Sequence, residues 1–284
     1  MTYSYHQGVR KESLDKPKLL ALAAITAGIL VLAIAAKSVF AAPPTTVVVT
    51  PGNAQGWSTA DTRANGSVGF VADTDTPLGT GALSLVTGAG GTGQDKAQYL
   101  HDANVPLSSV TSLSYYTKQV SATFANGAPS YQLLVDTDGT VGDGLGFTTL
   151  VYEPYNNGQT ITPNTWQAWD VDAGTFWSSR NVAAENANGG LVAGAGGAPF
   201  YSLADVQAKY PNAVAIGFGV NVGSNNSNWD TRADAVQFND TIYDFEVTPY
   251  VASNKDECKN GGWMNFQTGY KNQGQCVSAV AKQQ

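Results

Sequence analysis

The pattern of hydrophobic positions changes once along the chain. Leu19–Ala36 is an apolar run of 18 residues without a charge, whereas from Pro43 onward short β-branched or aromatic runs alternate with clusters of Gly, Asn, Asp and Pro. In Leu113–Thr117 and Ala213–Val220 every second residue is larger and more apolar, the period of a half-buried strand. The predicted strands, after an extended start at Pro43–Thr50, are Ser67–Val71, Ala82–Val86, Lys96–Leu100, Ser112–Lys118, Tyr131–Asp136, Phe147–Tyr152, Thr165–Asp170, Ala213–Val222, Ala233–Phe238 and Thr241–Val247. Short strands with regular turn signals predict an all-β, antiparallel, jelly-roll-like β-sandwich rather than βαβ units.

One short helix is predicted between two of these strands. Ser202 is a good N-cap, Asp205 occupies the third helical position, and Pro211 stops the helix after Tyr210.

The N-terminal segment indicates export. A polar, basic stretch precedes Leu19–Ala36, and small residues follow it before Pro43, which is the layout of a secretory signal peptide. The apolar run is long for a signal peptide and falls at the lower limit of a transmembrane helix. Residues 1–41 are therefore either a signal peptide cleaved after Ala41 or a retained helical membrane anchor, and they are the chain's only expected contact with a membrane.

The charge balance narrows the possible partners. The chain carries a net charge of −7, and without residues 1–41 it has 10 basic and 20 acidic residues, a net charge of −10. An acidic domain of this kind argues against nucleic acid and anionic lipid as partners, because both are bound through basic patches.

The two cysteines, Cys258 and Cys276, predict a disulfide, because a close pair in an exported chain is normally oxidised. A zinc site is poorly supported, since His101 is the only histidine after residue 41. We expect residues 42–250 to form the sandwich and residues 251–284 a small disulfide-stapled segment of two short helical turns.

Catalytic signatures are sparse. The chain lacks the usual nucleophile, zinc-protease and phosphate-loop motifs. Glu153 and Glu246 both end strand-like runs among aromatic residues, and a pair of carboxylates is what a glycoside hydrolase needs. The alternative is that both cap strand ends, which we favour.

A Ca²⁺ site is a second candidate. Asp136, Asp138 and Asp143 alternate with small residues around glycine turns, and carboxylates in such loops converge on calcium. The segment is no EF-hand, because Phe147 stands where the bidentate glutamate belongs. A hairpin that uses Asp and Gly for turn geometry explains the same residues.

The aromatic residues between positions 152 and 177 suggest a ligand surface, since aromatic faces stack on sugars while neighbouring polar groups bond the hydroxyls. An open, polar-rimmed surface is typical of such sites. Packing in a sandwich core is the alternative. Trp166 and Trp169 are three positions apart, so on a strand one of them faces away from the core. The candidate ligand contacts are Tyr152, Tyr155, Trp166, Trp169, Trp177 and Arg180.

Three segments, Trp57–Phe70, Leu78–Leu85 and Trp229–Phe238, resemble the opening and closing strands of bacterial extracellular jelly-roll modules. These modules in turn resemble carbohydrate-binding modules and concanavalin-like sandwiches. The tail from Cys258 to Val277 is similar to a C-terminal segment of many secreted bacterial proteins. The resemblance implies a fold more than an activity.

Together these features favour a secreted or surface-displayed, non-catalytic protein that binds a polysaccharide or another cell-envelope ligand. A glycoside hydrolase or lyase of concanavalin-like fold and a purely structural envelope protein are the alternatives.

Overall fold

The computed structural model describes residues 42–91, 93–247, 252, 254–266 and 270–282. The predicted signal peptide or anchor, residues 1–41, lies outside these ranges. Among the described residues, no helix has the length and apolar character needed to cross a membrane.

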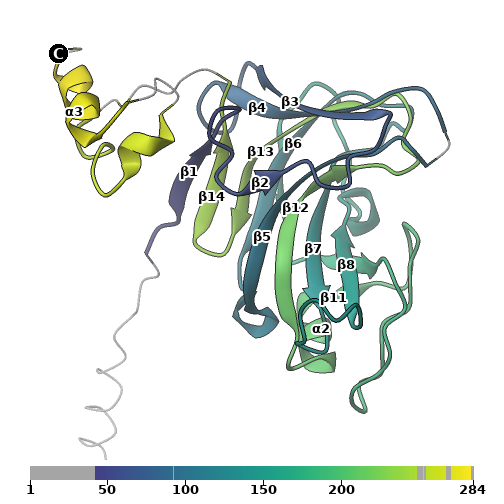
Figure 1. The fold of residues 1–284 in the computed structure, drawn as a ribbon. Helices are drawn as coiled ribbons and strands as arrows, with labels where there is room; N and C mark the ends of the chain where they lie inside the picture. The colour runs from purple at the N-terminus through teal and green to yellow at the C-terminus, as the bar shows by residue number, and fades with distance from the viewer. Residues whose placement is uncertain (1–41, 92, 248–251, 253, 267–269, 283–284) are drawn as a thin grey trace, which may run out of the picture. The chain divides into compact units, whose positions relative to one another are not determined.

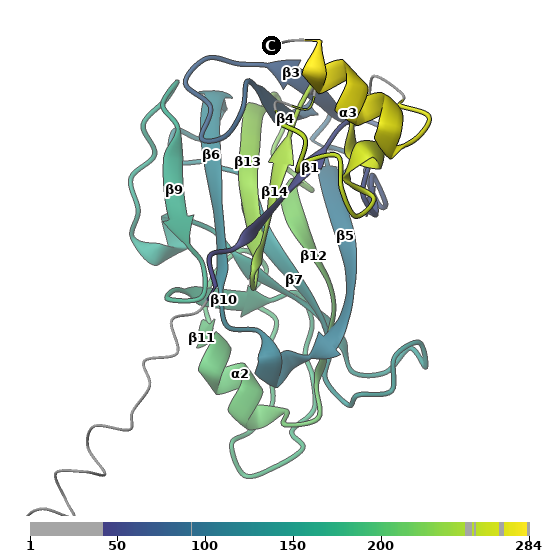
Figure 2. The same ribbon diagram turned by 90° about the vertical axis from the view of Figure 1, so that its left-hand side faces the viewer.

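The described residues contain two seven-stranded sheets (Figure 1). The first has the order β1-β14-β13-β4-β3, with β6 added on β13 and β9 on β6. Figure 2 shows β9, β6, β13, β14 and β1 side by side in this sheet. The strands of the first sheet are β1 (Thr45–Val49), β3 (Gly66–Ala72), β4 (Gly81–Thr87), β6 (Leu113–Ser121), β9 (Gln167–Asp170), β13 (Asp230–Phe238) and β14 (Thr241–Phe245).

The second sheet has the order β11-β10-β8-β7-β12-β5-β2. Its strands are β2 (Trp57–Ser58), β5 (Ala97–Pro106), β7 (Ser130–Asp136), β8 (Phe147–Tyr152), β10 (Thr175–Ser178), β11 (Tyr201–Ser202) and β12 (Val214–Val222). Short 3₁₀ turns follow β5 and β8, at η1 (Leu107–Ser109) and η2 (Tyr155–Asn157).

The mostly β prediction is confirmed, with one correction to the antiparallel expectation. β1 pairs with β14 in parallel, from Thr45 opposite Thr241 to Val49 opposite Phe245. The two strands lie far apart in the sequence and no tight hairpin joins them, so the connection allows parallel pairing. The jelly-roll topology stays a prediction.

Both sheets contribute inward side chains to one hydrophobic core. Trp57 on the edge strand β2 belongs to this core, where it stacks on Tyr99 at 5.3 Å between ring centroids and meets Phe218 and Phe245 edge-on. Each buried aromatic side chain removes a large apolar area from water, so this cluster stabilises the packing of the two sheets.

The helix α2 (Leu203–Lys209) forms where the sequence predicted it. Ser202 accepts a hydrogen bond from the Asp205 backbone N–H, and the Asp205 carboxylate accepts one from the Ser202 backbone N–H, which completes a capping box. Leu203 and Val206 are buried, so the helix covers part of the core.

A buried aspartate marks the point where β13 changes neighbours. β13 pairs with β4 from Asp230 to Ala233 and with β14 from Val236 to Phe238, with an irregularity after Asp234 against β6. The fully buried Asp234 carboxylate accepts hydrogen bonds from the backbone N–H groups of Phe245 (3.0 Å) and Leu78 (3.2 Å). It thus satisfies two backbone donors, one at the end of β14 and one in the turn between β3 and β4.

The tail forms the predicted disulfide, Cys258–Cys276, with the two Cα atoms 5.7 Å apart. Two helical elements flank the bend as expected, η3 (Gly262–Asn265) and α3 (Gln273–Ala281). Phe266 and Tyr270 pack against the disulfide, their ring centroids 5.6 Å apart. A core this small needs a covalent staple.

Candidate functional site

The outer face of the second sheet carries a cleft of about 550 Å³. Strand pairing arranges the residues of the cleft floor in rows across the sheet, because directly opposed residues point to the same face. One row joins Gln98 on β5, Asn221 on β12 and Ser130 on β7. The next row joins Leu100, Gly219, Gln132, Val151 and Trp177, and thus crosses five strands.

Two glycines lower the middle of this floor. Gly217 and Gly219 share the outward face of β12 with Asn221, since strand residues two apart point the same way. Gly217 is paired with Leu134 and Gly219 with Gln132, both of which line the cleft. With no side chain on β12 at these two positions, the neighbouring side chains stand higher than the strand between them.

The polar row contains two acceptors that lack protein donors. The carbonyl oxygens Gln98 Oε1 and Asn221 Oδ1 are buried, and within the described part of the chain no donor reaches either one. The amide nitrogens are engaged: Gln98 donates to Ala60 O at 3.1 Å, and Asn221 donates to Gly223 O at 3.3 Å. A buried acceptor without a partner costs free energy, and both residues line the cleft.

Trp177 and Glu153 form one wall of the cleft. The indole N–H of Trp177 donates to Glu153 Oε2 at 3.2 Å, and Asn156 donates to the same oxygen at 2.6 Å. Burial raises the pKa of Glu153, although the hydrogen bond from Trp177 opposes that shift. The pair fixes the orientation of an aromatic side chain that is half-buried at the edge of the cleft.

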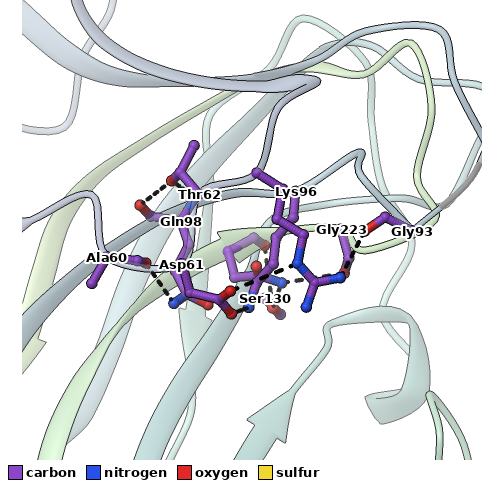
Figure 3. Close-up of polar contacts among 10 residues, drawn as sticks. Ala60, Asp61, Thr62, Gly93, Lys96, Gln98, Ser130 and Gly223 are labelled. Carbon is purple, nitrogen blue, oxygen red and sulfur yellow. Dashed lines mark hydrogen bonds and ion pairs between the residues drawn. The ribbon is translucent and has the colours of Figure 1, made fainter.

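Charged residues also line the cleft, and Figure 3 shows two of them, Asp61 and Lys96, in contact. Asp61 pairs with Lys96 and lies 3.7 Å from Arg63, and these contacts hold the pKa of Asp61 below its usual value, with the Lys96 hydrogen bond as the main cause. Arg63 also donates to the backbone oxygen of Gly93 at 2.6 Å. On the side of Trp177, Arg180 follows β10 by two residues and lies over the Phe147 ring at 4.9 Å from its centroid.

The predicted aromatic ligand contacts separate into different environments. Trp177 and Arg180 line the cleft. Tyr152 and Trp169 are 2% and 5% exposed and belong to the core, which favours the packing alternative for both. Trp166 is partly exposed beneath the Lys118 ammonium group, 5.5 Å from its ring centroid, and is not among the cleft residues.

Tyr155 forms part of a smaller, separate cavity. Its ring meets Phe124 edge-on at 5.1 Å, and both side chains are about half exposed. They line a cavity of about 250 Å³ together with Trp229, and Glu153 lines both this cavity and the cleft. The polypeptide therefore presents an exposed aromatic pair next to the Glu153 end of the cleft.

The two glutamates of the hydrolase alternative occupy different sheets. Glu153 lines the cleft on the second sheet, whereas Glu246 is buried at the end of β14 and accepts a hydrogen bond from the Thr80 N–H at 2.7 Å. Glu246 is not among the residues that line the cleft. The structure thus gives Glu246 the capping role that the sequence also allowed.

Glu246 belongs to a buried acidic cluster with Asp234 and Asp244. Burial, followed by the effect of the neighbouring Glu246, raises the pKa of Asp244 to about 7. Burial raises the pKa of Asp234 to about 8, against its hydrogen bond from Phe245. Desolvation disfavours the charged form of each carboxyl, so the protonated form of both gains population near neutral pH.

The predicted calcium ligands come together in the loop between β7 and β8. Asp136, Asp138 and Asp143 each place a carboxylate oxygen within 4.8 Å of the others. Each also accepts a hydrogen bond from a nearby backbone N–H: Asp136 from Gly139, Asp138 from Thr140 and Asp143 from Leu145. One oxygen per carboxylate therefore serves the turn, and Ca²⁺ binding by the group stays a prediction.

Sequence reasoning missed the amide row of the cleft. The usable signal was the polar residue in the middle of an otherwise apolar strand, as at Gln98 and Gln132. Their alignment with Asn221 depends on pairing between strands that are far apart in the chain.

Comparisons with known proteins give only a distant likeness. No family model matches the chain, and no curated protein matches it. Among solved structures, it is similar to a family 11 carbohydrate-binding module from Clostridium thermocellum in complex with a β-1,3-1,4-mixed-linked tetrasaccharide, at 11% identity and a TM-score of 0.38, covering 72% of this chain and 99% of that one. It is also similar to a putative sugar binding protein from Bacteroides thetaiotaomicron VPI-5482, at 13% identity and a TM-score of 0.36, covering 70% of this chain and 95% of that one.

Proposed function

We propose that the protein is exported and binds a glycan, without cleaving it, in the cleft on the second sheet. The observation that carries the proposal is the row of Gln98, Asn221 and Ser130, in which two buried carbonyl oxygens have no donor among the described residues. Sugar hydroxyls are donors of the required kind. Trp177 lies in the next row, two strands beyond β7, and supplies an aromatic surface. Leu100 and Leu134 supply apolar contacts.

The mixture of groups favours a sugar over other small molecules. The cleft combines neutral amides and hydroxyls with aliphatic side chains, which matches the polar edges and apolar faces of a pyranose ring. An open cleft that crosses five strands also suits a chain of several sugar units better than one enclosed molecule. The exposed Phe124–Tyr155 pair extends the surface beyond Glu153, and we include it as a second sugar contact.

Export is the second part of the proposal. It rests on the N-terminal sequence pattern and on the Cys258–Cys276 disulfide, which persists in oxidising compartments. The protein would then meet its glycan outside the cell, either free or tethered to the membrane through residues 1–41.

Replacement of Trp177 tests the site. Trp177→Ala removes the aromatic surface and the donor to Glu153, so we expect glycan affinity to fall roughly 10- to 30-fold, about 1.5–2 kcal/mol. Binding is measured on a glycan array and then by isothermal titration calorimetry with the preferred glycan.

Trp166→Ala is the matched control, because it removes the same side chain outside the cleft. Equal affinities of the two variants for the glycan would refute the assignment to this cleft. Release of new reducing ends from the bound glycan would refute the non-catalytic part of the proposal.

A further inference from the structure

Positive charge is concentrated in the cleft although the surrounding domain is strongly acidic. Between residues 42 and 247 the sequence has 6 basic and 18 acidic residues, a net charge of 6 − 18 = −12. Three of the six cations line the cleft, namely Arg63, Lys96 and Arg180. Only two carboxylates accompany them there, Asp61 and Glu153, so the cleft has the opposite sign to the rest of the domain.

The cations outside the cleft are engaged. Lys118 pairs with Asp73 and Arg232 pairs with Asp230, while Lys209 donates to the backbone oxygen of Asn188. Each of these three positive charges therefore already has a partner within the fold.

The cations in the cleft are only partly compensated. Asp61 is the common partner of Lys96 and Arg63, so one carboxylate serves two positive charges. Among the described residues, no carboxylate lies within ion-pairing distance of Arg180. Its guanidinium lies over Phe147, and stacking of this kind leaves the N–H groups at the edge of the plane free to donate.

The remaining carboxylate opposes this charge weakly. Glu153 already accepts hydrogen bonds from Trp177 and Asn156, and its burial favours the neutral form. A ligand in the cleft therefore meets a site whose uncompensated charge is positive.

We propose that the glycan bound in this cleft is acidic, and that Arg180 and Arg63 contact its carboxylate or sulfate groups. The inference rests on the glycan-binding function proposed above and deepens it by naming the ligand class. An arginine fork matches a carboxylate or sulfate with two parallel hydrogen bonds, which are stronger than those between neutral groups. Gln98, Asn221 and Trp177 would contact the uncharged part of the same sugars.

The test compares ligands that differ only in charge. Full-length protein is titrated with a neutral β-1,4-glucose hexasaccharide, with the β-1,4-glucuronate hexasaccharide of the same linkage, and with a sulfated form of the neutral one. A glycan array of neutral and acidic chains with other linkages is probed in parallel. We expect the acidic chains to bind at least about tenfold more tightly at low salt, and we expect this preference to shrink as the ionic strength rises to about 0.5 M. The carboxylated and sulfated ligands distinguish the two sources of negative charge.

Arg180→Gln is the diagnostic variant, and Lys209→Gln is its control, because it removes one positive charge outside the cleft. Arg180→Gln should lower the ratio of acidic to neutral affinity roughly tenfold, whereas Lys209→Gln should leave that ratio unchanged. Equal binding of neutral and acidic chains, or an equal effect of both variants, would overturn the acidic ligand and leave glycan binding standing. If no glycan of either kind binds, the proposed function itself is wrong.

Discussion

The cleft and the acidic cluster of Asp234, Asp244 and Glu246 both bury polar side chains, but the buried groups differ in their chemistry. In the cleft the buried groups are the neutral amides of Gln98 and Asn221, whose oxygens have no donor among the described residues. In the acidic cluster they are carboxyl groups, and Asp234 and Glu246 accept hydrogen bonds from the backbone. A neutral amide cannot lower its cost by changing its charge, so an incoming donor is what relieves it. A carboxyl group can bind a proton instead, which couples the cluster to pH.

The largest effect expected from this contrast is on stability. In an unfolded chain an aspartate titrates near pH 3.9, whereas the folded pKa values are about 7 for Asp244 and about 8 for Asp234. Between these limits the folded state binds more protons than the unfolded state, so stability falls as the pH rises from 4 to 8. We expect the free energy of unfolding to drop by about 2 kcal/mol or more between pH 5 and pH 8, measured by urea denaturation in metal-free buffer.

Asp244→Asn tests whether Asp244 contributes to this pH dependence of stability. The amide is neutral at every pH and still offers a donor to Glu246, so the variant should lose part of the pH dependence and keep most of the stability at pH 5. An unchanged slope of unfolding free energy against pH would contradict the protonation of Asp244.

The second prediction concerns the neutral amides of the cleft. Gln98→Leu removes an unpaired acceptor, so glycan affinity should fall by roughly 5- to 10-fold, about 1–1.4 kcal/mol. The melting temperature should move little, since the lost hydrogen bond to Ala60 is offset by relief of the buried oxygen. Calorimetry measures the glycan affinity, and thermal melting measures the stability. A large loss of stability with unchanged binding would show that the amide serves the fold alone.

The smallest effect is expected at the loop of Asp136, Asp138 and Asp143. If it binds Ca²⁺ as the sequence predicts, added calcium should raise the melting temperature by about 2–4 °C, and the double variant Asp138→Asn, Asp143→Asn should lose that rise. An equal rise in the wild type and in the variant would place the effect elsewhere in the molecule.

The sequence predicts most strands because their inward residues alternate, but it predicts strands with a polar half as too short. β5 was expected to end at Leu100, yet it continues through His101–Pro106, where every second residue is exposed. The predicted strand over Ala233–Phe238 is β13, which begins three residues earlier at Asp230, and Thr231 in that added part is fully buried. β10 was missed, since four residues around Trp177 are too few to show a period.

The candidate site was harder to predict than the fold. Trp177 and Arg180 were found from residue type, because aromatic and arginine side chains suggest ligand contact wherever they occur. Gln98, Asn221 and Ser130 come from three strands that are distant in sequence, and only the pairing register places them in one row. Packing of the whole sandwich sets the register between such strands. The periodicity within a single strand therefore does not reveal that register.

The parallel pairing of β1 with β14 has a mechanical consequence. The chain enters the first sheet at Thr45 and leaves β14 at Phe245, and because the two strands run the same way these points lie at opposite ends of the ladder. A force that pulls the two ends of this domain apart therefore acts along the strands and loads all their hydrogen bonds at once, whereas an antiparallel pair would open one bond at a time. A domain held at its N-terminal side would resist extension in shear, the direction in which a β ladder is strongest.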